Sequence, residues 1–96
     1  MTIMTLLEFA GMDRQAYDRL GASLQAQGAP AGILFHSCGA VPNGWRIVDA
    51  WRSQEDFDHF VDETLLPAAR SLGIPAPARR EHFHAYHAGM VAPGAC

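Results

Sequence analysis

Residues 43–57 have the sequence NGWRIVDAWRSQEDF, and this stretch indicates the fold more clearly than any other part of the chain. The Asn-Gly pair at its start is typical of a tight β-hairpin turn, and residues 45–51 that follow alternate as a strand does. Ser53, with Asp56 three residues later, resembles a capping box, so a helix is expected to begin there. The stretch therefore predicts a turn, a strand and a helix in succession.

The segments before this stretch supply a strand, a helix and another strand. Residues 2–10 are mostly apolar and include β-branched side chains, which predicts a strand. Asp13 is a good N-cap for a helix over residues 14–27, where apolar side chains recur at helical spacing, and Gly28 suits its end. Residues 32–37 predict the next strand.

The segments after it complete the fold. Pro67 ends or kinks the second helix because proline has no N–H, and a short extra turn is expected to stop at Gly73. A last strand is predicted over residues 80–88. The resulting β-α-β-β-α-β order, with right-handed crossovers, gives a four-stranded antiparallel sheet with both helices on one face. We therefore expect one α+β domain of ferredoxin-like topology spanning residues 1–96.

Composition narrows the classes of function. The net charge is −3, and the seven basic residues are all Arg, with Arg79-Arg80 the only adjacent pair, so no nucleic-acid partner is expected. No apolar run reaches the roughly 20 residues of a membrane span, and no basic leader precedes the first apolar run, which favours a cytoplasmic location. Abundant Ala, Gly, Arg and Pro without Lys suggest a bacterial source. Cys38 and Cys96 form no CxxC pair and are expected to be free thiols.

Alternation along the strands divides their side chains between the two faces of the sheet. Small or apolar residues suit the face under the helices, so Val48, Ala50, Phe83 and Ala85 are expected there. The other, open face would carry the aromatic and imidazole side chains of the third and last strands, which are Trp45, Ile47, Asp49, Trp51, His82, His84 and Tyr86. Leu6 and Glu8 of the first strand are expected to join them. From the second strand, His36 with Leu34 is the preferred set.

Such an open face would be a large exposed apolar patch, which monomeric soluble proteins avoid. The simplest way to cover it is a second copy of the chain, packed face to face. The sequence therefore predicts a barrel-like homodimer that encloses a cavity lined by aromatic rings and imidazoles.

The run from Gly44 to Phe57, with Phe60 and the later segment LGIP at 72–75, resembles the dimeric α/β-barrel superfamily, and within it the small bacterial proteins named after antibiotic biosynthesis monooxygenases. The resemblance covers nearly the whole chain in element order and is specific mainly over residues 44–60. It implies a homodimer with one pocket per subunit, between the sheet and the helices or in the barrel. It also implies oxidation of aromatic, polyketide-like substrates without metal or flavin, in a group that includes cyclases and haem-degrading enzymes.

This chain departs from the group at several positions. Oxygenases of the group tend to use an Asn and a Trp in the pocket; Trp51 matches the Trp, but Ile47 stands four residues earlier and no equivalent Asn is found. The haem-degrading branch uses a strand-one Asn where this chain has Glu8, and a haem-ligand His where residues 67–69 read PAA. Haem degradation is therefore not expected.

The chemistry predicted for the pocket begins with proton abstraction. A substrate stacked on Trp51, with Trp45, His36, Ile47 and Leu6 around it, would lose a proton to His82 or His84, oriented by Asp49, while Tyr86 would bond the developing oxyanion. The carbanion would then react with O₂ in an oxygenase or with an internal carbonyl in a cyclase or isomerase. No cofactor is needed for either route.

Other interpretations of the same residues stay open. The histidines can serve as packing or interface residues, Asp49 can belong to a buried ion pair, and the indoles can belong to a core. His82 and His84 could also hold a metal with His36 and Asp49 or Glu8, although an H-x-H spacing alone is a weak signal. A non-catalytic ligand-binding dimer is the remaining alternative.

Overall fold

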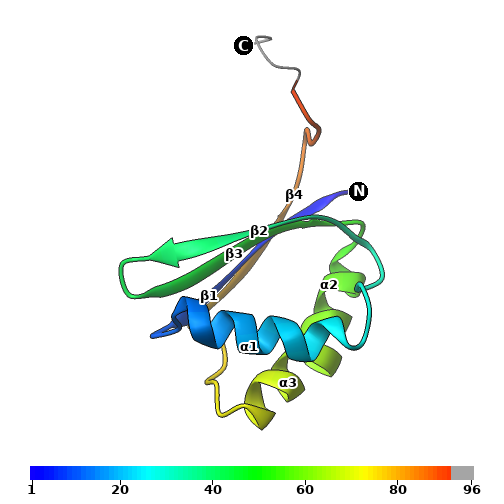
Figure 1. Cartoon of the computed structure of the whole chain (residues 1–96). Helices are drawn as coiled ribbons and strands as arrows, with labels where there is room; N and C mark the ends of the chain where they lie inside the picture. The colour runs from blue at the N-terminus through cyan, green and yellow to red at the C-terminus, as the bar shows by residue number, and fades with distance from the viewer. Residues whose placement is uncertain (92–96) are drawn as a thin grey trace.

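A computed structural model of the chain describes residues 1–91. Its four strands form one antiparallel sheet in the order β2-β3-β1-β4, and the helices all lie against one side of that sheet (Figure 1). The predicted βαββαβ order and ferredoxin-like topology are confirmed. The elements are β1 (Ile3–Ala10), α1 (Arg14–Gln25), β2 (Ile33–Val41), β3 (Gly44–Trp51), α2 (Gln54–Phe60), the π-helical segment η1 (Val61–Leu65), α3 (Leu66–Ser71) and β4 (Arg79–His84).

Local signals in the sequence set the helix starts. The Asp13 carboxylate accepts a hydrogen bond from the Ala16 N–H at 2.8 Å, which caps α1. The Ser53 hydroxyl accepts one from the Asp56 N–H at 3.1 Å, which caps α2. Both predicted caps are therefore present.

The β2–β3 hairpin turns through Pro42 and Asn43, with Gly44 already paired to Val41 as the first residue of β3. A Cβ atom at Gly44 would lie 2.1 Å from the Phe9 carbonyl oxygen, so β1 passes too close for any side chain there. The predicted hairpin is confirmed, and glycine is needed for the close approach of β1 rather than for the turn.

Pro67 interrupts the second helical segment without ending it. The Leu66 N–H bonds to the Val61 carbonyl five residues earlier, which widens the helix into one π-helical turn just before the proline. Pro67 then lies in the first turn of α3, where a missing N–H costs least. Gly73, with φ of 72°, ends α3. The expected extra turn is thus confirmed, and the interruption at the proline takes the form of a π-helical turn.

The strand registers assign side chains to faces, because residues opposite each other in antiparallel strands point to the same side. On the helix side, successive rows across the sheet are Ile33–Trp51–Ile3–His84, His36–Asp49–Thr5–His82 and Cys38–Ile47–Leu7–Arg80. On the open side, they are Phe35–Ala50–Met4–Phe83, Ser37–Val48–Leu6–Glu81 and Gly39–Arg46–Glu8–Arg79.

The predicted face assignment was therefore wrong for β2, β3 and β4. His36, expected on the open face, lies on the helix side, and Phe35 lies on the open face. Val48, Ala50 and Phe83 lie on the open face, whereas the sets expected there lie under the helices: Trp45, Ile47, Asp49 and Trp51 on β3, and His82 and His84 on β4. Ala85 and Tyr86 follow the end of β4 at His84 and belong to neither row. Leu6 and Glu8 do lie on the open face, as expected.

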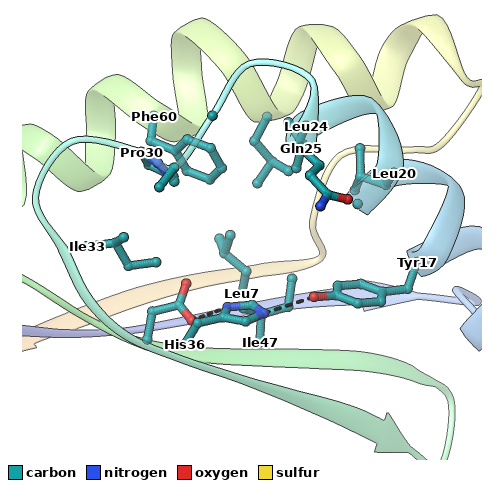
Figure 2. A pocket seen from close by; sticks show the side chains of 15 residues that line it. Leu7, Tyr17, Leu20, Leu24, Gln25, Pro30, Ile33, His36, Ile47 and Phe60 are labelled. Atoms are coloured by element: carbon teal, nitrogen blue, oxygen red, sulfur yellow. Dashed lines mark hydrogen bonds and ion pairs between the residues drawn. The ribbon is translucent and has the colours of Figure 1, made fainter.

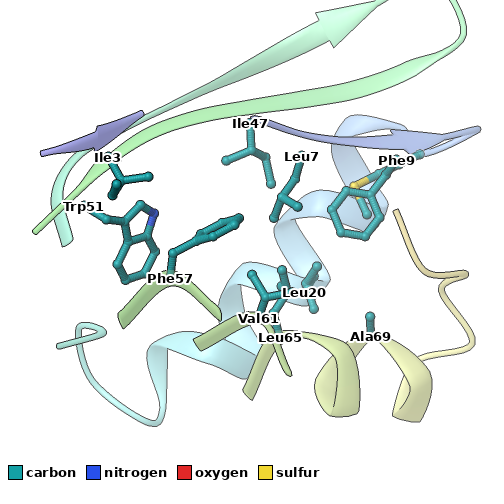
Figure 3. Close-up of a cluster of buried hydrophobic side chains, with 11 residues drawn as sticks. Ile3, Leu7, Phe9, Leu20, Ile47, Trp51, Phe57, Val61, Leu65 and Ala69 are labelled. Atoms are coloured by element: carbon teal, nitrogen blue, oxygen red, sulfur yellow. The ribbon is translucent and has the colours of Figure 1, made fainter. Parts of the chain in front are cut away.

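The physical reason is the volume of the side chains. Trp51 is completely buried and packs against Phe57 and Phe60, with ring centroids 5.8 and 5.5 Å away. Figure 3 shows the Trp51 ring beside Phe57 in the core. Burying an indole removes far more apolar area from water than burying Ala50 would. On β3 the bulkier alternating set therefore faces the helices and joins the core, which also contains Ile3, Leu7, Phe9, Leu20, Ile47, Val61 and Leu65.

Candidate functional site

A cavity of about 460 Å³ lies between the helix side of the sheet and α1 (Figure 2). The loop after α1 (residues 26–32) and the second helical segment close it from the sides. Its wall is mainly apolar and consists of Leu7, Tyr17, Leu20, Gly21, Leu24, Gln25, Gly28, Ala29, Pro30, Ile33, His36, Ile47, Asp49, Phe60 and Leu65. The cavity is formed within one chain, so it does not depend on a space between two sheets.

Three polar side chains form a connected line on this wall. The His36 Nδ1 atom lies 2.8 Å from Oδ1 of Asp49, and its Nε2 atom lies 2.9 Å from the Tyr17 hydroxyl. The three residues come from β2, β3 and α1. Figure 2 shows the His36 ring lying between its two partners at the floor of the cavity.

Asp49 is the buried end of this line, with only 5% of its surface exposed. It lies directly opposite His36 in the β2–β3 register, which explains why the two side chains meet. Burial raises the pKa of the Asp49 carboxyl, while His36 and the Ser37 backbone N–H act in the opposite direction. A buried carboxylate needs such partners to be tolerated.

The hydrogen-bonding inventory fixes the direction of each bond. An ionised Asp49 carboxylate can only accept, so His36 donates from Nδ1, and in the neutral imidazole Nε2 is left as an acceptor. Tyr17 must then donate its hydroxyl proton to Nε2. Burial raises the pKa of Tyr17 well above its usual 10, with further contributions from Cys38, Asp49 and Asp18, so the phenol stays protonated.

Trp45 supports Tyr17 from the side. The two rings stack with centroids 5.1 Å apart and an interplanar angle of 25°. The Trp45 indole N–H is buried and has no hydrogen-bond partner within residues 1–91. Stacking limits the positions open to the Tyr17 ring and keeps its hydroxyl at the cavity wall.

Not all of the residues predicted for the site come together. His36, Asp49 and Ile47 line the cavity, and Trp45 borders it through Tyr17. Trp51 lies in the core, and Leu6 points to the opposite side of the sheet.

The predicted bases on β4 lie apart from Asp49. His82 belongs to the same row across the sheet, but Thr5 of β1 stands between them, and His82 and His84 are both exposed. Tyr86 is 95% exposed beyond the end of the strand. Whether these three residues have a chemical role stays a prediction.

Tyr17 was missed in the sequence, where it counts only as part of the apolar stripe of α1. The available signal was its hydroxyl, because a tyrosine that packs its ring inward usually needs a hydrogen-bond partner there. His36 supplies that partner.

The metal-ligand set considered from the sequence is not assembled. His36 lies on β2 and His82 on β4, with two strands between them, and Glu8 points to the open face. Across residues 1–91, no three His, Cys, Asp or Glu side chains gather as ligands would. Cys38 is an exposed free thiol, and Cys96 lies outside the described residues.

Comparison with solved structures identifies the fold. A variant of SnoaB, a cofactor-independent oxygenase from Streptomyces nogalater, superposes with a TM-score of 0.64 at 13% identity, over 91% of this chain and 95% of that chain. A candidate antibiotic biosynthesis monooxygenase from Chloroflexus aurantiacus gives 0.64 at 15% identity, over 94% and 98%. The chain has the fold of the antibiotic biosynthesis monooxygenases.

A more distant structural match extends the range of proteins with this fold. MupZ from Pseudomonas fluorescens gives a TM-score of 0.56 at 13% identity, over 84% of this chain and 69% of that chain. No protein-family model and no curated protein matches the sequence. Within the described part of the chain, no helix is long and apolar enough to cross a membrane.

Proposed function

We propose that this protein is a small-molecule enzyme of the cofactor-independent oxygenase kind, in which His36, paired with Asp49, takes a proton from an aromatic, polyketide-like substrate. The observation that carries the proposal is the Asp49–His36 pair on the wall of an apolar cavity. An imidazole is a suitable base near neutral pH, and a carboxylate behind it stabilises the imidazolium that forms. The fold shared with SnoaB supports the same kind of chemistry.

The composition of the cavity wall favours a neutral ligand. Asp49 is the only wall residue with a formal charge at neutral pH, and no Arg lines the cavity. A carboxylate or phosphate would enter without a cation to pair with, at a large cost in desolvation. An uncharged ring system with an acidic C–H or O–H group avoids this cost.

The reaction can be written without a cofactor. The proton of an activated C–H bond moves to Nε2 of His36, and the electron pair of that bond becomes part of an enolate. For anthrone, the enolate passes one electron to O₂, and the two radicals combine as a peroxide anion. The His36 imidazolium returns its proton to give the hydroperoxide, and loss of water leaves the quinone. One O₂ is consumed for each anthraquinone and each water formed.

Cyclisation shares the first step of this reaction. The same carbanion can attack an internal carbonyl, so the Asp49–His36 pair would also serve a cyclase or isomerase. Oxygen uptake separates the two routes, because cyclisation consumes none.

We also propose that a second copy of the chain covers the open face of the sheet. Phe35 and Phe83 lie in one row on that face and are 51% and 63% exposed in the single chain. Leu6 and Val48 lie in the next row. Large apolar side chains on one face of a sheet favour association.

Oxygen uptake with anthrone tests the proposed function. His36→Gln, which keeps polarity but removes the base, should lower kcat by about 10²–10⁴-fold. His59→Gln, exposed on α2 and outside the cavity, is the matched control and should leave kcat near the wild-type value. Equal losses in both variants, or turnover that requires added metal, would contradict the assignment of His36.

A further inference from the structure

The Tyr17 hydroxyl occupies the place that a substrate must take to reach the base. It lies 2.9 Å from Nε2 of His36, the nitrogen left as acceptor by the bond from Nδ1 to Asp49. Proton abstraction at Nε2 therefore requires that this hydroxyl give up its bond. Once released, the Tyr17 hydroxyl can donate instead to the oxygen of the enolate that forms beside it.

We propose that Tyr17 is a catalytic residue with two successive roles: its hydroxyl caps Nε2 of His36 in the empty cavity, and it donates to the substrate oxygen once substrate takes its place. This inference rests on the proposed function, because it assumes that His36 is the base. It assigns the oxyanion donor of the reaction to α1.

The position of Tyr17 suits both roles. Its ring stacks on Trp45, which keeps the hydroxyl at the cavity wall beside Nε2 of His36. Gln25 is the other uncharged side-chain donor on the wall, and it has no bond to His36. Tyr17 is therefore the donor that any group bound at Nε2 meets first.

The protonation state of Tyr17 agrees with a donor. The groups around the phenol are Asp18 on its own helix, His36 and Cys38 on β2, and Asp49 on β3. None of them is a fixed cation that would favour tyrosinate, and burial raises the pKa of Tyr17. The phenol can thus bond an oxyanion without losing its own proton.

The substrate C–H bond breaks and its proton forms an N–H bond at Nε2, so that His36 becomes an imidazolium paired with Asp49. The electron pair moves into the enolate, whose negative oxygen accepts the Tyr17 O–H. Tyr17 neither gains nor loses a proton.

Tyr17→Phe tests the role while keeping the ring on Trp45. Removing one donor to a developing oxyanion typically lowers kcat by about 10²–10³-fold, and KM for anthrone should change little. Ser71→Ala is the control, because it removes an exposed hydroxyl outside the cavity. An unchanged kcat, or a higher one because Nε2 is freed from its cap, would overturn the proposal.

A binding experiment separates failure of this inference from failure of the proposed function. The absorbance of bound 2-naphthol reports the fraction ionised at neutral pH, with no turnover needed. Wild type should bind a mixture of neutral 2-naphthol and naphtholate. Tyr17→Phe should lower the ratio of ionised to neutral ligand about 10- to 100-fold, and His36→Gln should abolish ionisation of the bound ligand. This pattern without oxygen uptake would refute the oxygenase and keep the Tyr17 role. Oxygen uptake that depends on His36, with the ionised fraction unchanged in Tyr17→Phe, would refute the Tyr17 role alone.

Discussion

Asp49 and His36 face each other on neighbouring strands, with the carboxylate Oδ1 2.8 Å from the imidazole Nδ1. The Asp49 side chain is buried, whereas about half of the His36 side chain is exposed toward the cavity. The pair therefore consists of a buried carboxylate, Asp49, and an imidazole, His36, that a ligand can reach. This asymmetry makes Asp49 the orienting partner and His36 the group that meets the substrate.

Asp49→Asn should change how stability depends on pH. Burial raises the pKa of Asp49 above 3.8, so the folded chain holds this proton more tightly than the unfolded chain does. The carboxyl then contributes stability that is present below about pH 4 and is lost as the pH rises through the raised pKa. In urea unfolding, the free energy of unfolding of the variant minus that of wild type should increase from about pH 4 toward neutrality.

Asp62→Asn supplies a control of opposite sign. Asp62 bonds to Arg80 at 2.8 Å, and this bond lowers the pKa of the carboxyl. The Asp62 carboxylate therefore contributes stability at neutral pH, and this contribution is lost as the pH falls through the lowered pKa. The free energy of unfolding of Asp62→Asn minus that of wild type should accordingly decrease with rising pH. Parallel curves for the two variants would contradict the burial assigned to Asp49.

Gly21→Leu should block the cavity without weakening the fold. Gly21 lines the cavity from α1, and a Cβ atom there would meet nothing within 4 Å. Replacing a mid-helix glycine should stabilise the helix by about 0.5–1 kcal/mol, while the new side chain takes up ligand space. The affinity for 2-naphthol should fall at an unchanged or higher Tm; Ala22→Leu, at the exposed neighbouring position, should leave it intact.

Gly44→Ala should destabilise the sheet by about 1–3 kcal/mol, because the added methyl group cannot fit without moving β1. The obstacle is the Phe9 carbonyl oxygen, 2.1 Å from the position of the new Cβ. Gly39, also in the hairpin, has nothing within 4 Å of its Cβ position, so Gly39→Ala is the control. Thermal unfolding that shows equal losses in both variants would contradict the close approach of β1 and β3.

Local sequence signals predicted the elements because each signal acts within a few residues. Asp13 and Ser53 cap helices through bonds three residues away, and Pro67 perturbs the turn that contains it. The faces of the strands could not be obtained in this way. On β3, both alternating sets are largely apolar, and only the packing of Trp51 against α2 decides between them.

The site depended on still longer-range information. A β-bulge between Ile33 and Phe35 shifts the alternation of β2, so that Ile33 and His36 both face the cavity although their positions differ by three, an odd number. From the sequence, His36 was expected to share a face with Leu34, two residues earlier. His36 and Asp49 were predicted to lie on the same face of the sheet. The contact of His36 with Tyr17 could not be predicted, because it depends on how α1 lies over the sheet.

Phe83→Asp should convert the proposed homodimer to a monomer. Phe83 lies on the open face in the row Phe35–Ala50–Met4–Phe83 and is 63% exposed in the single chain, so a carboxylate there costs little within one subunit. In a face-to-face dimer the same charge would be buried without a partner, which is costly. Light scattering after gel filtration should show half the mass, with folding retained by circular dichroism. Ala22→Asp, on the exposed side of α1, should stay dimeric; a wild-type protein that is already monomeric would contradict the proposal.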